Sequence, residues 1–144
     1  ASEAEARALS IRPGDPVVLV RRLRLADDLP VAVEHAVLVR RTADVVMAAD
    51  LETGSLHEAL ARAGLQLRRR QATITSEAAT IDDASLLGVG TGEPLLVERR
   101  VIADVAGRLV EATESRYPGD RYALDVRFDV DDGTQDDRRP GDGA

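Results

Sequence analysis

The sequence has no cysteine and no tryptophan, and it contains only two histidines among its 144 residues. Without cysteine the chain can form no disulfide, thiolate nucleophile or sulfur-ligated metal site. The two histidines, His35 and His57, are too few to predict a metal centre. Neither has an obvious nucleophile partner in a Ser-His-Asp order. The sequence therefore predicts no metal and no other cofactor, and it offers no support for catalysis.

Aromatic residues are also scarce, at 2% of the chain, and the formal net charge is −7. Few rings leave no platform on which bases could stack, and an acidic chain repels phosphate backbones. This chain is therefore not expected to bind nucleic acid by itself. No apolar run approaches the length of a membrane span, and the first residues contain no apolar stretch for export. We expect a cytoplasmic protein that does not contact a membrane.

The apolar residues of the chain are mostly aliphatic, and their spacing predicts short helices and several strands. The expected strands are residues 17–26, 31–39, 65–75, 94–105, 108–117 and 122–130. The expected helices are residues 2–9, 56–63 and 82–87, with a loose helical turn over residues 42–50. Residues 1–130 are expected to form one domain. Residues 131–144 contain no apolar residue able to anchor them, which predicts a disordered acidic tail.

An internal repeat is the most informative feature of the sequence. Residues 6–22 align with residues 84–100 without a gap, and each copy runs from a helix through a Gly-containing turn into an aliphatic strand that ends in Arg-Arg. Each copy continues through a turn into a second strand, which holds Glu34 or Glu111. Two long copies predict two half-sheets related by a pseudo-two-fold axis. The expected fold is α+β, one antiparallel sheet with helices packed on one side.

Five phrases of the sequence resemble one known family in its order and at compatible spacing: LSIRPGDPV, RLRLADDLPVAVE, GSLHEAL, LGVGTGEPLLVER and SRYPGDRY. The chain resembles the UTRA domain, the effector-binding half of the HutC/FarR branch of GntR-family transcription regulators. The resemblance implies a chorismate-lyase-like fold with a small-molecule effector as partner. It also implies a homodimer, and DNA binding only through an N-terminal winged helix-turn-helix domain that this chain lacks.

Two arginines and a glutamate form the first part of the expected ligand site. Arg22 and Arg24 are two residues apart on a strand and so share one face. An odd-numbered loop such as Asp27-Asp28-Leu29 places Glu34 on that same face, opposite Arg22, where a cross-strand ion pair is the simplest interpretation. In the family that the chain resembles, arginines at these positions bind an anionic group of the effector, such as a sugar phosphate. The matching glutamate binds sugar hydroxyls.

Three further residues complete the expected site. Ser55 is the natural N-cap of the helix that follows it, with Glu58 completing a capping box, and the resemblance places this turn at the phosphate end of the effector. Glu111 and Tyr117 share one face of the second hairpin and would bind the rest of the effector. Pro118 departs from the family, which commonly has arginine there.

Other interpretations of the same residues stay open. His57 stands where the family often has tyrosine and is expected to be a partly exposed helix residue. Arg99 and Arg100 are expected to be surface charges, and Tyr122 is expected to pack in the core. The first alternative function is a chorismate-lyase-like enzyme on the same fold, which turnover of chorismate would reveal. The second is a degenerate domain that serves dimerisation without an effector.

Overall fold

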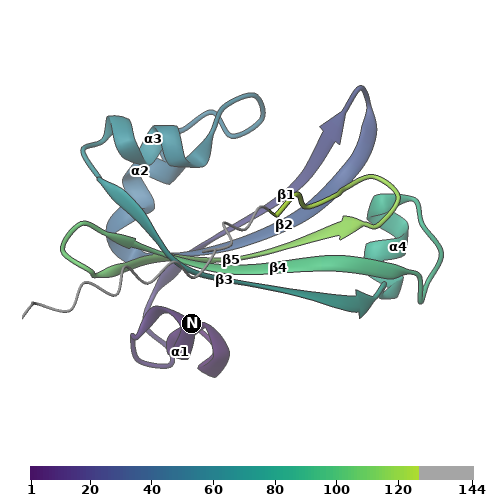
Figure 1. Ribbon diagram of the computed structural model, residues 1–144. Coiled ribbons are helices and arrows are strands. Elements are labelled where there is room, and N and C mark those ends of the chain that lie inside the picture. Colours follow the sequence, from purple (N-terminus) through teal and green to yellow (C-terminus); the bar gives the residue numbers. More distant parts are fainter. Residues whose placement is uncertain (127–144) are drawn as a thin grey trace, which may run out of the picture.

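Five antiparallel strands form a single sheet in the order β1–β2–β5–β4–β3 (Figure 1). The computed structural model describes residues 1–126, apart from the side chains of Arg69 and Arg70. The strands are β1 (Val17–Ala26), β2 (Leu29–Val39), β3 (Leu67–Ala78), β4 (Pro94–Asp104) and β5 (Leu109–Pro118). The helices are α1 (Glu3–Leu9), α2 (Ala43–Ala48), α3 (Leu56–Arg62) and α4 (Ile81–Leu87), with a 3-10 turn η1 (Arg40–Thr42) before α2. None of these helices is long and apolar enough to cross a membrane.

The two copies of the repeat adopt the same local structure. Copy one is α1–β1–β2 and copy two is α4–β4–β5, and the two copies meet where β2 pairs with β5. Ser10 and Gly88, which end α1 and α4, both have left-handed backbone. Gly14 and Gly92 follow with φ of 84° and 87°, a conformation that favours glycine. The expected pseudo-two-fold arrangement is present in the structure.

The helices cover both faces of the sheet, which corrects the expectation that they pack on one side. Ala36 and Leu38 of β2 pack with α2 and α3 through a cluster that includes Leu60. Val33, which points to the opposite face of β2, packs with Leu87 of α4. Figure 1 shows α1 below the sheet and α2 and α3 above it. The sequence pattern could not show this because both faces of the strands carry aliphatic residues. We call the two sides the α3 face and the α4 face.

The connection between β1 and β2 differs from the expected three-residue loop, but it produces the predicted strand register. Asp27 and Asp28 alone form the turn, both with positive φ, as in the two-residue turns that fit the twist of strands. A bulge between Arg24 and Leu25 then shifts the pairing by one residue. The turn and the bulge together place Glu34 opposite Arg22. The predicted register is therefore confirmed.

The sixth expected strand is not formed where the structure describes it. Residues 122–126 are in no helix or strand, and residues 127–130 lie outside the described residues, as does the tail expected at 131–144. The ring of Tyr122 instead stacks on Tyr117, with centroids 4.0 Å apart. Leu124 and Val126 are about half exposed, so the alternation that predicted a strand here does not correspond to burial on a sheet.

Candidate functional site

Polar side chains gather on the α3 face of the sheet, in adjacent cross-strand rows. One row runs from Arg22 through Glu34 and Ser115 to Glu98. The neighbouring rows place Thr113 beside Arg100 and Glu111 beside Leu38. A sheet face that packs against helices is normally apolar. This face therefore combines a hydrophobic cluster under α2 and α3 with a polar region beside it.

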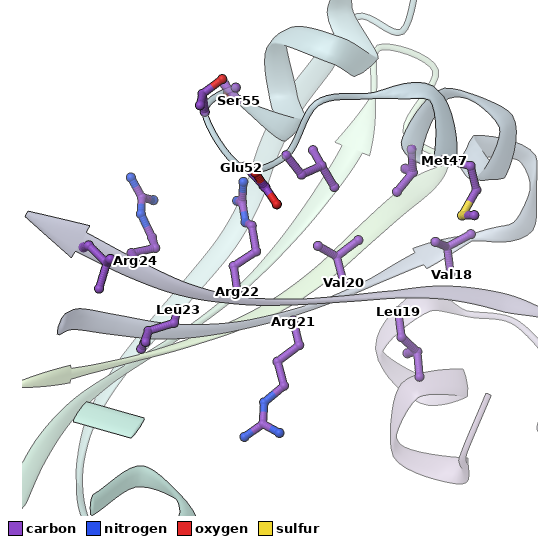
Figure 2. Close-up of a pocket in the computed structure, with 15 residues that line it drawn as sticks. Val18, Leu19, Val20, Arg21, Arg22, Leu23, Arg24, Met47, Glu52 and Ser55 are labelled. Atoms are coloured by element: carbon purple, nitrogen blue, oxygen red, sulfur yellow. The ribbon is translucent and has the colours of Figure 1, made fainter. Parts of the chain in front are cut away.

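A cleft of about 1000 Å³ lies between β1 and the chain that joins α2 to α3. Figure 2 shows Arg22 and Arg24 pointing into it from β1, below Ser55 and Glu52, whereas Arg21 points to the other face. Val18 and Val20 provide an apolar wall. The other lining residues include Val46, Met47, Leu51, Thr53 and Gly54. Pockets of this size with a few convergent polar groups are typical of small-molecule sites.

Glu34 is the centre of the charged groups beside the cleft. Its side chain is 2% exposed, and its Oε1 accepts hydrogen bonds from Nε of Arg22 at 3.0 Å and from Nη2 of the same residue. Its Oε2 lies 3.3 Å from Nη2 of Arg100 and 3.9 Å from Nη1 of Arg24. Arg22 is mostly buried, whereas the side chain of Arg24 is 58% exposed. Two guanidinium groups therefore hold the buried carboxylate, and a third remains open to the cleft.

The chain above the cleft is ordered by its own hydrogen bonds. The carboxylate of Asp50 accepts from the backbone N–H groups of Glu52 and Thr53 and from the Thr53 hydroxyl. Gly54 is required here because a Cβ would collide with the backbone oxygen of Asp50. Ser55 caps α3 as expected, accepting from the backbone N–H of Glu58 at 3.4 Å. The Ser55 hydroxyl keeps its own proton available for a ligand in the cleft.

Glu111 lies on the same face but does not line the cleft. Its side chain is 1% exposed, and its Oε2 lies 2.8 Å from Nε2 of His57. The hydroxyl of Thr113 donates to its other oxygen. Burial raises the pKa of Glu111, but hydrogen bonds from His57 and Thr113 and the nearby charges of His57 and Arg100 lower it by more, so the pKa lies below 4.5. Glu111 is therefore an ionised anchor between the sheet and α3.

Because Glu111 is ionised in the folded protein, the free energy of unfolding should depend on pH. A carboxylate whose pKa is lowered by folding stabilises the fold above its unfolded pKa of about 4.5 and loses that contribution as the pH falls through the folded value. At pH 6 we expect Glu111→Gln to lower the free energy of unfolding by about 1–3 kcal/mol. The difference from the unmodified chain should shrink as the pH falls below 4.5. Urea unfolding at several pH values checks this, and a difference that stays constant over the range would contradict it.

Tyr117 also stands apart from the cleft. It lies on the α3 face beside Leu96 of β4, is 9% exposed, and is covered by the stacked ring of Tyr122. Of the six residues predicted for the site, Arg22, Arg24 and Ser55 line the cleft and Glu34 lies buried against the two arginines. Glu111 and Tyr117 share the face without lining the cleft.

Two residues of this region were not predicted. Arg100, expected on the surface, has a side chain only 12% exposed between Glu34 and Glu98, and the expectation was wrong. Arg99 points to the opposite face, where it is half exposed and pairs with Glu77 and Glu114. Since neighbouring strand residues alternate between faces, one of the two had to point toward the helices on the α3 side. The second missed residue, Glu52, lines the cleft from a loop, for which no sequence signal exists.

The fold and the site together define a class of protein, a small α+β domain with a charged cleft on one face of its sheet. The chain belongs to the UTRA domain family, whose model matches residues 1–123. The HTH-type transcriptional repressor NagR of Bacillus subtilis is 29% identical over 106 residues, which are 73% of this chain and 43% of the repressor. This chain thus spans less than half the length of that relative.

Solved structures of the same fold come from transcription regulators. The effector domain of PhnF from Mycobacterium smegmatis is 25% identical with a TM-score of 0.83, covering 90% of this chain and 80% of that one. The C-terminal domain of the histidine utilization repressor from Pseudomonas syringae pv. tomato is 26% identical with a TM-score of 0.76, covering 90% and 91%. The α+β, chorismate-lyase-like fold of GntR-family effector domains is therefore confirmed.

Proposed function

We propose that this chain is the effector-sensing domain of a transcription regulator and that its effector is a small polar metabolite with an anionic group, such as a sugar phosphate. The observation that carries the proposal is the pair of arginines that point into one cleft, Arg22 and Arg24. Guanidinium groups form paired, charge-assisted hydrogen bonds with phosphate or carboxylate oxygens. The matched relatives are transcription regulators, which supports a regulatory role without catalysis.

The two arginines have different parts in the proposal. Arg24 is the more exposed and lies 3.9 Å from Glu34, beyond hydrogen-bond distance, so its guanidinium can turn to a ligand at little cost. Arg22 already gives two hydrogen bonds to Glu34 and has further N–H groups to offer. Ser55 contributes its hydroxyl from the opposite wall of the cleft. Glu34, Glu111 and Tyr117 share the α3 face with the cleft, and would bind the uncharged part of an effector that extends from the cleft along this face.

Regulation requires that the ligand bind two conformers unequally, because equal binding shifts no equilibrium. The cleft joins β1 to the α2–α3 connection, so a ligand there would fix these two parts relative to each other. In the full-length regulator that change would alter the affinity of an N-terminal winged helix-turn-helix domain for DNA. The homodimer expected from the family resemblance stays a prediction.

Titration calorimetry with inorganic phosphate, glycerol 3-phosphate and glucose 6-phosphate tests the anion site. We expect Arg24→Gln and Arg22→Gln to weaken the binding of all three probes by about 10- to 100-fold, since a hydrogen bond to a charged group contributes roughly 1.5–3 kcal/mol. Arg24→Gln is the cleaner variant because its side chain is mostly outside the buried ion pair.

Arg21→Gln is the matched control for this experiment. Arg21 directly precedes Arg22 in the sequence but points to the opposite face of β1 (Figure 2). Its replacement changes the net charge equally and should leave the dissociation constants within about twofold. Equal losses for Arg21→Gln and Arg24→Gln would mean that only long-range charge matters, and no loss for Arg24→Gln would refute the site.

A further inference from the structure

Two buried polar atoms beside Glu34 have no hydrogen-bond partner among the residues that the structure describes. Ser115 faces Glu34 on one side and Glu98 on the other, and the residue is 1% exposed. Its Oγ makes no hydrogen bond, and neither does Nε of Arg100. The other nitrogens of Arg100 lie 3.3 Å from Glu34 and 3.3 Å from Glu98. The two unpaired atoms thus belong to one cluster of polar side chains on the α3 face.

Unpaired buried groups of this kind cost free energy and are rare in folded proteins. A strand position facing the sheet interior accepts alanine or valine readily, so the fold does not require a hydroxyl at position 115. The two terminal nitrogens of Arg100 pair with the carboxylates of Glu34 and Glu98. Its Nε–H has no acceptor among the described residues. A partner that is present only in the ligand-bound protein would account for both atoms.

The chemistry of Ser115 and Arg100 indicates which kind of ligand atom could form hydrogen bonds with both. The Nε–H of Arg100 can only donate, and the Ser115 hydroxyl can donate or accept. A single oxygen acceptor would therefore satisfy both. A charged oxygen is disfavoured, because the carboxylates of Glu34 and Glu98 flank the position and like charges repel. A neutral oxygen, in a hydroxyl or an amide carbonyl, fits both the donors and the charges.

We propose that Ser115 and Arg100 form a second subsite that binds a neutral hydroxyl or carbonyl oxygen of the ligand whose anionic group lies at Arg22 and Arg24. This inference rests on the proposed function. Ser115 lies two strands away from Arg22 in the same row, and strands are about 4.8 Å apart. The two groups of the ligand are therefore separated by roughly 5–10 Å. Entry requires the Arg22 guanidinium to turn from Glu34 toward the anion.

Ser115→Ala is the decisive variant because a binding role and a structural role predict opposite effects on the free protein. Removing an unsatisfied buried hydroxyl should leave the thermal midpoint unchanged or raise it by about 2–4 °C. The same variant should weaken binding of glucose 6-phosphate by about tenfold and leave inorganic phosphate within about twofold, since that ion is too small to occupy both subsites at once. Arg100→Lys keeps the charge but lacks the Nε–H, and should show the same selectivity.

Ser85→Ala on α4, an exposed position, is the control and should change neither quantity. A lowered thermal midpoint for Ser115→Ala would show that the hydroxyl has a structural partner, and would overturn the inference. Unchanged affinity for glucose 6-phosphate, with Arg24→Gln still weakening all three probes, would overturn the subsite and leave the anion site intact. Failure of the unmodified chain to bind any of the three probes would reject both proposals.

Discussion

Replacing Glu34 by alanine is expected to lower the free energy of unfolding by about 3–5 kcal/mol, the cost of breaking a buried ion pair by removing one partner. The carboxylate is 2% exposed and contacts the guanidinium groups of Arg22 and Arg100. Without it, both groups stay in a largely buried environment with fewer acceptors. Urea unfolding followed by circular dichroism measures the loss.

Glu3→Ala provides the comparison for Glu34→Ala. Glu3 also pairs with an arginine, Arg7, but its side chain is 81% exposed, and exposed pairs of this kind contribute at most about 1 kcal/mol. A loss below about 1 kcal/mol for Glu34→Ala would show that the arginines find other partners or water. The buried charge cluster would then have no part in holding the sheet together.

Arg121→Met should lower the free energy of unfolding by about 2–4 kcal/mol, since hydrogen bonds from a charged donor contribute more than neutral ones. The guanidinium of Arg121 donates to the carbonyl oxygens of Pro30 at 2.8 Å and Leu87 at 2.6 Å, and reaches that of Gly88 at 3.5 Å. These oxygens belong to the start of β2 and the end of α4. A cation at the carboxyl end of a helix is also favoured by the helix dipole.

Methionine matches the unbranched stem of arginine as far as Nε, so this variant removes the guanidinium donors and keeps the packing of the stem. Arg62→Met is its control, because Arg62 is 73% exposed in a pair with Glu58, and surface changes of this kind are usually within about 0.5 kcal/mol. Thermal unfolding of the two variants should therefore differ by several degrees. Equal midpoints would show that the carbonyl oxygens are satisfied equally well by water.

The strand register could be predicted because side-chain alternation is strict and the repeat supplied two aligned copies. The parity of the β1–β2 hairpin placed Glu34 opposite Arg22, and the structure reaches that pairing with a shorter turn and a bulge. The sequence could not distinguish a two-residue turn with a bulge from a three-residue loop, because Asp27 and Asp28 are compatible with both. The sequence could therefore predict which residues share a face of the sheet, but it could not predict the backbone conformation of the hairpin.

The site itself was only partly predictable, because burial depends on elements that are distant in the sequence. Arg100 looks like a surface charge until β2 is known to place the buried carboxylate of Glu34 beside it. Tyr117 and Glu111 share the predicted face, but the cleft opens over β1, at one side of the sheet. Residues 122–126 alternate as a strand would, yet both edges of β5 are already occupied by β2 and β4.

The two copies of the repeat are related by symmetry in the sheet, but the segment that covers the α3 face is not repeated within residues 1–126. The segment containing α2 and α3 follows the first copy of the repeat, between β2 and β3, and the described chain after β5 has no counterpart. The upper wall of the cleft is therefore present over one half of the sheet only in the described chain. Under the proposed function, the expected stoichiometry is a single effector per polypeptide.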